Sequence, residues 1–435
     1  MNLLSRLALA LVLTAGWVSA ASQPRDMHDD RERVFDAVVD VFERNYWDAT
    51  YLDWQEWAAP YRSDALSARS REAFDRVLGR MIGEVGDDHS SWLGLVAYAR
   101  NEDIPGVGPS RLGIRATLLN GTGLVVERVF PGTAAALAGL RRGDVIVRVD
   151  GRELNRLESR YRVWELLREA ADRQIVSLEL LRGRSRVGTT LAPAPFELAL
   201  AEQLPQAEML DERLGYLYVP SFNRDDIASE VHRLLRELQG QGLAELVIDL
   251  RGNPGGRIGE LGLTLGAFLD GTWARAVSRG EVVWHGRYAV EGRRGATWLE
   301  DPRGEALLTR YVDAPTVFSG PLAVLVDRRN SSAGEIAALV LQAQGRALVV
   351  GEPTHGNVEA VRGFDLPDGS VVMVAVANLE APDGQSFSAG VVPDSVARES
   401  LRELAFGYDA PLSEAIRLLR GLPFTPNRYF GQSAT

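Results

Sequence analysis

The 435-residue chain contains no cysteine and no lysine, so its 48 basic residues other than histidine are all arginine. Without cysteine there is no disulfide framework and no lipid attached through a thiol. Without lysine there is no side-chain amine to act as a catalytic base or to bind phosphate in a P-loop. The net charge of −11 argues against nucleic-acid binding, which needs a basic face.

Long apolar runs are also missing, except at the N-terminus. Residues 7–18 are mostly apolar, Arg6 precedes them, and small residues follow around Ala20. This pattern is typical of a secretory signal peptide, and the run is short for a membrane span. A membrane anchor and an apolar first helix are the alternatives. We therefore expect residues 1–20 to be a signal peptide, and the mature protein to be periplasmic or secreted without a membrane span.

Hydrophobic periodicity divides the remaining chain into four predicted segments. Residues 31–97 repeat apolar side chains at helical spacing, which predicts an N-terminal helical domain. Residues 108–195 contain short β-type runs around one short helix. Residues 197–400 alternate buried strands with helices, which favours a largely parallel α/β core. Residues 401–435 form a predicted helical tail.

The β-type segment carries a recognisable pattern. "LGI" begins it, and "VFPGTAAALAGLRRGDVIVRVDGREL" follows. The stretch resembles a PDZ domain. The resemblance implies that an extended peptide binds as an added strand, with its C-terminal carboxylate held at the turn formed by Leu112, Gly113 and Ile114. The alternative is a small β domain whose groove is vestigial or filled by its own linker.

Two turns of the α/β segment have the residue types that acyl chemistry needs. "RGNPGG", residues 251–256, follows a buried strand, and its glycines allow backbone N–H groups to converge on an oxyanion. Taken alone, it fits an ordinary tight turn equally well. In "NSSAGEI", Ser332 with Glu335 fits a helix capping box. Ser331 could instead serve the turn and leave Ser332 free as a nucleophile.

The order of the motifs is more specific than any one of them. Along the chain come "GDDHSSWL", the PDZ-like stretch, "LGYLYVPSF", "LVIDLRGNPGG", "VLVDRRNSSAGEI", "RALVVGEPTHGN", "LPDGS" and "GVVPD". Together they resemble the superfamily of C-terminal processing (tail-specific) and tricorn-type serine peptidases. The resemblance implies a multidomain α+β protein with a crotonase-like α/β core. It also implies peptide-bond hydrolysis through an acyl-enzyme on Ser332, with an oxyanion hole from Ala333 and either Gly255 or Gly256.

The absence of lysine bears directly on this resemblance. The tail-specific branch places a catalytic lysine in a T-F-G-K-G turn, where this chain has Asn357, which is no base. The lysine-free tricorn-like branch uses a histidine from the N-terminal helical segment, and His89 matches its position. Imidazole titrates near neutrality, as a general base requires. His355 is the rival base. A polar helix end capped by Asp88 and Ser90 is the other interpretation of His89.

The group that would orient the imidazole is left open. The family's acidic position falls near Phe387, so Asp88, Glu359 and Glu380 are the candidate substitutes. No metal site or cofactor is indicated, because the histidines are dispersed and H-E-x-x-H is absent.

Two functions follow from these patterns. The first is an exported Ser–His endopeptidase whose PDZ-like domain recruits peptides, C-terminal segments or unfolded protein; esterase activity at the same site is a weaker variant. The second is a catalytically inactive, peptidase-like module that binds peptide or another ligand.

Overall fold

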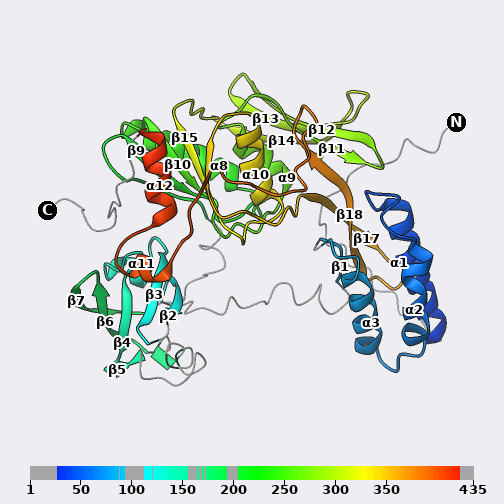
Figure 1. The fold of residues 1–435 in the computed structure, drawn as a ribbon, viewed down its shortest axis with the longest axis horizontal. Helices are drawn as coiled ribbons and strands as arrows, with labels where there is room; N and C mark the ends of the chain where they lie inside the picture. The colour runs from blue at the N-terminus through cyan, green and yellow to red at the C-terminus, as the bar shows by residue number, and fades with distance from the viewer. Residues whose placement is uncertain are drawn as a thin grey trace.

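The computed structural model describes most of the chain. The described residues are 27–87, 89–93, 112–119, 121–154, 173–193 and 204–421, together with Val163, Leu166, Glu169 and Ala170. The predicted signal peptide and Asp88 lie outside them. Figure 1 shows a helical part near the N-terminus, a small β part and a larger α/β part between and above them. Within the described ranges, no helix has both the length and the hydrophobicity needed to cross a membrane.

The helical part packs around an aromatic centre. Its elements are α1 (Met27–Asn45), α2 (Trp54–Leu66), α3 (Arg71–Gly83) and the short strand β1 (Ser91–Trp92). Val34, Val38 and Phe42 recur every four residues on α1 and are all buried, as helical periodicity requires. Asp53 and Ser70 cap α2 and α3 by accepting backbone N–H groups.

The small β part is a five-stranded path, ordered β2-β3-β4-β6-β7, with β5 added beside β4. Its elements are β2 (Ile114–Leu119), β3 (Gly123–Val129), α5 (Ala134–Leu137), β4 (Val145–Val149), β5 (Arg152–Glu153), β6 (Val176–Arg182) and β7 (Ser185–Leu191). Gly113 enters β2 with φ +79°, and a Cβ there would lie 2.2 Å from that of Thr133. The turn before β2 therefore requires glycine.

The α/β core is a six-stranded sheet, ordered β19-β16-β15-β10-β9-β8. The strands are β8 (Gln206–Met209), β9 (Leu214–Tyr218), β10 (Glu245–Asp249), β15 (Leu322–Val326), β16 (Leu348–Gly351) and β19 (Ser395–Val396). All neighbours pair in parallel except β8 and β9. Side chains of α8 (Ile227–Gly240), α9 (Ile258–Leu265) and α10 (Ala333–Ala343) share one hydrophobic cluster with one face of this sheet. The other face packs against α12 (Ala410–Leu419), which follows α11 (Leu401–Ala405).

A second, antiparallel sheet joins the core to the helical part. Its path is β1-β18-β11-β12-β13-β14, and β17 also pairs with β18. The strands not yet located are β11 (Gly271–Ser278), β12 (Glu281–Glu291), β13 (Arg294–Glu300), β14 (Ala306–Asp313), β17 (Glu359–Asp365) and β18 (Val371–Glu380). In Figure 1, β18 runs from the core down to the helices α1 and α3. The predicted multidomain α+β class is confirmed.

Candidate active site

Ser332 lies just beyond the carboxyl end of β15, at the N-cap of α10. Its backbone has φ 51° and ψ −130°, a conformation that residues other than glycine rarely adopt. Its Oγ makes no hydrogen bond to any residue that the structure describes. Strained strand-to-helix turns of this kind expose serine nucleophiles in hydrolases.

The capping-box interpretation of Ser332 and Glu335 is wrong. The Ser332 side chain makes no cap hydrogen bond. The Glu335 carboxylate is fully buried and accepts the backbone N–H groups of Gly356, at 2.8 Å, and Asn357, at 2.9 Å. Glu335 therefore holds a neighbouring turn in place, and Ser332 Oγ remains available.

The glycine loop approaches Ser332 closely. A Cβ on Gly255 would lie 2.7 Å from that of Ser332, and Gly255 has φ +97°. The N–H of Gly255 donates to Asn253 Oδ1 at 2.8 Å, so it is already used within the loop. The N–H groups of Gly256 and Ala333 have no acceptor in the described part of the chain. Of the two glycines proposed from the sequence, Gly256 is the one with an unengaged donor.

The turn that replaces the lysine turn contacts the serine through its backbone. Ser332 N–H donates to the carbonyl of Asn357 at 2.7 Å. The side chain of Asn357 makes no hydrogen bond to the described residues. His355 is exposed and is likewise not hydrogen-bonded to them. The structure therefore brings the backbone of Asn357 to Ser332, whereas the His355 side chain has no hydrogen bond to any described residue of the site.

His89 is hydrogen-bonded to Glu359. Its Nδ1 lies 2.9 Å from Glu359 Oε2, and the two side chains are only 11% and 12% exposed. Asp87 accepts the His89 backbone N–H at 3.1 Å and the Ser90 hydroxyl at 2.6 Å. Ser90 Oγ in turn accepts the N–H of Ala375 on β18 at 3.2 Å. These bonds, which sequence reasoning did not anticipate, anchor the segment that carries His89.

Among the candidate acids, the structure brings only Glu359 to His89 in the part of the chain it describes. Glu380 is paired with Arg275 at 2.7 Å, and Phe387 is buried. Glu359 follows Asn357 by two residues, so one turn supplies both the backbone contact to Ser332 and the carboxylate on His89. No hydrogen bond joins Ser332 to His89 in the described structure.

Buried charges lie directly before the glycine loop. Arg251 donates to Asp249 at 2.7 Å and to Asp409 at 2.9 Å, and all three side chains are at most 5% exposed. Burial alone would raise the pKa of Asp249, but the charge and hydrogen bonds of Arg251 outweigh it and hold that pKa well below its usual range. The loop therefore starts from a rigid, charge-paired anchor.

The predicted peptide-binding turn lies at an edge of the small sheet. The side chains of Leu112 and Ile114 are buried in the hydrophobic core of this domain, so they do not line a groove. Strand β2 is an edge strand of the described sheet, which leaves room for an added strand.

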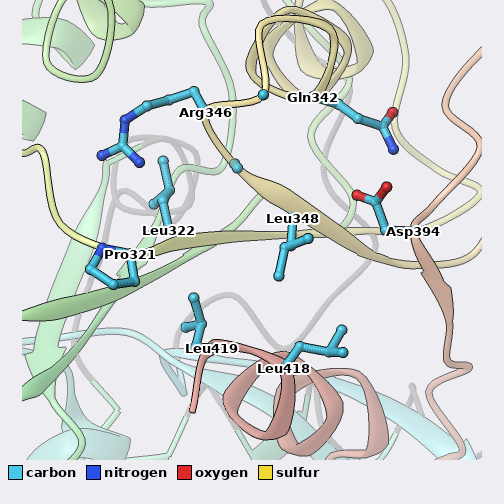
Figure 2. Close-up of a pocket in the computed structure, with 10 residues that line it drawn as sticks. Pro321, Leu322, Gln342, Arg346, Leu348, Asp394, Leu418 and Leu419 are labelled. Carbon is cyan, nitrogen blue, oxygen red and sulfur yellow. The ribbon is translucent and has the colours of Figure 1, made fainter. Parts of the chain in front are cut away.

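A separate hollow lies at the opposite end of the parallel strands. Its volume is about 350 Å³, and Leu322 and Leu348 line it at the amino ends of β15 and β16. Figure 2 shows Leu418 and Leu419 of α12 closing its lower side. Because Ser332 follows the carboxyl end of β15, this hollow is not part of the site.

The α/β fold, the strained serine and the glycine loop have the arrangement of a serine-hydrolase site, and comparison with known proteins indicates the family. Residues 213–397 match Peptidase family S41, and residues 103–181 match the PDZ domain. These matches confirm the predicted resemblance to a PDZ-containing peptidase of the C-terminal processing and tricorn type. The assignment to the lysine-free branch stays a prediction.

Individual relatives agree with these domains. The chain is 28% identical over 393 residues to a chloroplastic C-terminal processing peptidase of Tetradesmus obliquus, covering 86% of this chain and 79% of the relative. It is 27% identical over 471 residues to the putative tricorn protease homolog 2 of Streptomyces coelicolor, covering 95% of this chain and 34% of the relative. A putative S41 protease from Bacteroides fragilis shares the fold, with TM-score 0.57 at 18% identity, over 93% of this chain and all of that one.

Proposed function

We propose that this protein is a serine endopeptidase in which Ser332 is the nucleophile, His89 the general base and Glu359 the residue that orients His89. The hydrogen bond between His89 Nδ1 and Glu359 carries the proposal. A carboxylate on Nδ1 stabilises the tautomer with its proton there, which leaves Nε2 free to accept the serine proton. The S41 domain supports the reaction class.

The acylation step follows from this arrangement. His89 Nε2 takes the proton from Ser332 Oγ as the oxygen attacks the scissile carbonyl carbon. The N–H groups of Ala333 and Gly256 stabilise the resulting oxyanion, and the positive end of the α10 dipole adds to this effect. When the tetrahedral intermediate collapses, the C–N bond breaks, and the imidazolium gives its proton to the leaving amine.

Deacylation reverses the same proton path. His89 takes a proton from water, and the hydroxide attacks the acyl-enzyme carbonyl. The second tetrahedral intermediate collapses as His89 returns the proton to Ser332 Oγ. In this proposal the hydrogen bond between Ser332 and His89 forms when substrate binds, because catalytic contacts in free enzymes are often long. No metal or cofactor takes part.

The PDZ domain would bring substrate to this site. An extended peptide would add to the open edge of β2, and backbone groups at residues 112–114 would hold its terminal carboxylate. Names of relatives as carboxyl-terminal-processing proteases support substrates cut near their C-termini. With residues 1–20 as a signal peptide, the enzyme would act in the periplasm or outside the cell on peptides or unfolded protein. We also propose a helical domain at residues 31–97, a PDZ-like domain at 108–195, a peptidase core at 197–400 and a helical tail at 401–435.

Covalent labelling tests the proposal directly. Purified wild-type protein is treated with a fluorophosphonate, and the modified residue is mapped by mass spectrometry. We expect Ser332 to be labelled in the wild type and in His355→Ala, and labelling to be lost in Ser332→Ala and His89→Ala. Labelling that survives His89→Ala but not His355→Ala would overturn the assignment of the base. A folded wild type that is never labelled would favour the inactive binding module.

A further inference from the structure

A cleft of about 900 Å³ lies between the PDZ domain and the α/β core, which is within the usual size range of ligand sites. Strand β8 of the core forms one wall. The end of β3 and the loop before β4 form the other, and Phe406 and Gly407 also line the cleft. We propose that this cleft binds an extended acidic peptide segment. The site is distinct from the turn at residues 112–114 and goes beyond the proposed catalytic function.

The two walls are held together by specific contacts. Val125 and Val145 of the PDZ sheet share a hydrophobic cluster with Leu404 of α11. A Cβ on Gly143 would lie 2.6 Å from the carbonyl oxygen of Leu404, so the backbones are in close contact there. Arg142 of the PDZ domain pairs with Asp409 of the core at 3.0 Å. These packed and ion-paired surfaces hold the PDZ domain and the core in a fixed relative position, so the fold itself sets the width of the cleft.

The charge of the cleft contrasts with that of the protein. Five arginines and three carboxylates line it, although the whole chain has a net charge of −11. The Arg182 guanidinium is already paired with Asp144, to which it donates two hydrogen bonds, at 2.8 and 2.7 Å. Arg184 is exposed at the cleft and has no ion pair or hydrogen bond with the described residues. At Arg184, an anionic ligand would therefore meet a positive charge that no described carboxylate neutralises.

Arg128 is the second and stronger indication of a ligand. Its side chain is 8% exposed, and its guanidinium makes no hydrogen bond within the described structure. It stacks 3.2 Å from the centre of the Tyr218 ring and lies 3.6 Å from Asp249 Oδ2. Buried guanidinium groups normally bind acceptors in two directions, and leaving donors unsatisfied costs free energy. A carboxylate in the cleft supplies the missing acceptors.

Gln206 of β8, on the other wall, also has a buried donor, Nε2, without a hydrogen-bond acceptor within the described residues. Two residues that line the cleft therefore carry donors without an acceptor in the described structure, and a ligand rich in acceptors would satisfy them. Glu127 and Glu208 also line the cleft, so the acidic groups of the ligand must face Arg128 and Arg184.

The edge strand β8 indicates that the ligand is a peptide. Among the strands that the structure describes, β8 pairs only with β9, so no described strand occupies its other edge, and β8 residues line the cleft. An extended peptide can add to such an edge through main-chain hydrogen bonds. Alternate side chains of an added strand point to one face, so acids at every second position would lie together on the face toward the arginines.

Peptide binding by fluorescence anisotropy tests the inference. The protein is the full chain carrying Ser332→Ala, which prevents cleavage and makes the result independent of the proposed catalysis. The probe is a labelled peptide of about ten residues that alternates Asp with Val, enough to span β8. Its C-terminus is amidated so that the turn at residues 112–114 has no carboxylate to hold. The matched peptide replaces each Asp with Asn.

We expect saturable binding of the acidic peptide and at least about tenfold weaker binding of the neutral one. Arg128→Gln and Gln206→Ala should each weaken the acidic peptide several-fold. Arg184→Gln, at an exposed position, should do the same without any risk to folding. Arg303→Gln removes the same charge from an exposed loop between β13 and β14 and should bind like the parent. Equal binding of both peptides, or equal losses in Arg184→Gln and Arg303→Gln, would overturn the inference.

Discussion

His89 Nδ1 lies 2.9 Å from Glu359 Oε2, although the two residues are 270 positions apart. Strand β18 explains how they meet, because it pairs with β1 along one edge and with β17 along the other. Met373 of β18 has Ser91 and Gly363 as its two partners. His89 comes just before β1, and Glu359 is the first residue of β17. The pair is therefore held by a sheet that joins the N-terminal helices to the core.

The first prediction concerns this pair. Glu359→Gln should lower kcat/KM on a peptide substrate by about 10²-fold or more, because an amide N–H directed at Nδ1 stabilises the wrong imidazole tautomer. His89→Ala should cost about 10²- to 10⁴-fold, the usual contribution of a general base. Glu380→Gln is the matched control, since that carboxylate pairs with Arg275, and its activity should stay within a few-fold of wild type. A larger loss in Glu380→Gln than in Glu359→Gln would reverse the assignment.

The second prediction concerns the strained backbone of Ser332. Ser332→Ala and Ser332→Gly should both abolish fluorophosphonate labelling. Glycine adopts φ 51° without a Cβ penalty, whereas alanine keeps the strain. We therefore expect the glycine variant to match or exceed the alanine variant in free energy of unfolding, by up to about 1 kcal/mol. Urea unfolding of the two variants measures the difference, and a clearly more stable alanine variant would argue against strain.

The third prediction separates the two residues that shape the turn beside Ser332. Glu335→Gln turns one acceptor oxygen into an N–H₂ group that faces a backbone N–H of Gly356 or Asn357. The loss of a charge-assisted, buried hydrogen bond should lower the free energy of unfolding by about 2 kcal/mol and reduce turnover. Asn357→Ala should change both quantities little, because only the backbone of Asn357 is used.

Urea unfolding and kcat, measured on both variants, check this prediction. A large loss of activity in Asn357→Ala with normal stability would mean that the asparagine side chain itself acts in the site.

The fourth prediction is a pH dependence of stability that arises from His232. This side chain is fully buried on α8, where Nε2 donates to the Leu263 carbonyl at 3.0 Å and Nδ1 accepts the Thr316 N–H at 3.0 Å. Burial lowers the pKa of His232 below its usual value of about 6.5. As the pH falls below about 6.5, the unfolded chain therefore binds a proton that the folded chain does not.

Stability should consequently decrease toward acid, with a slope of at most about 1.4 kcal/mol per pH unit from this residue. Urea unfolding at about pH 7.5 and about pH 5.5 measures the loss, which should be smaller in His232→Gln. An unchanged pH slope in that variant would show that other groups cause it.

Local patterns were sufficient for much of the site. Ser332 and the glycines at 255 and 256 follow buried strands directly, so their place at the carboxyl edge of a parallel sheet can be predicted from the order of strands and helices. The missing lysine excludes one base by composition alone. Asn357 could be placed near the serine because the turn around it resembles the lysine turn of the tail-specific branch. These inferences depend on short stretches of chain, where neighbouring residues stay neighbours in space.

Partners far apart in sequence were decided only by the tertiary structure. Local spacing predicts a cap for Glu335, but its carboxylate binds a turn 21 residues later, because a buried charge takes whichever donors the fold brings to it. Glu359 could not be selected over Glu380 from sequence, since both lie on neighbouring strands and only strand pairing determines which one meets His89. Sequence by itself determined the class of fold and placed the Ser332 turn and the glycine loop at one edge of the sheet. Packing across β18 decided which acid meets His89, because hydrogen bonds act over about 3 Å of space, whatever the separation along the chain.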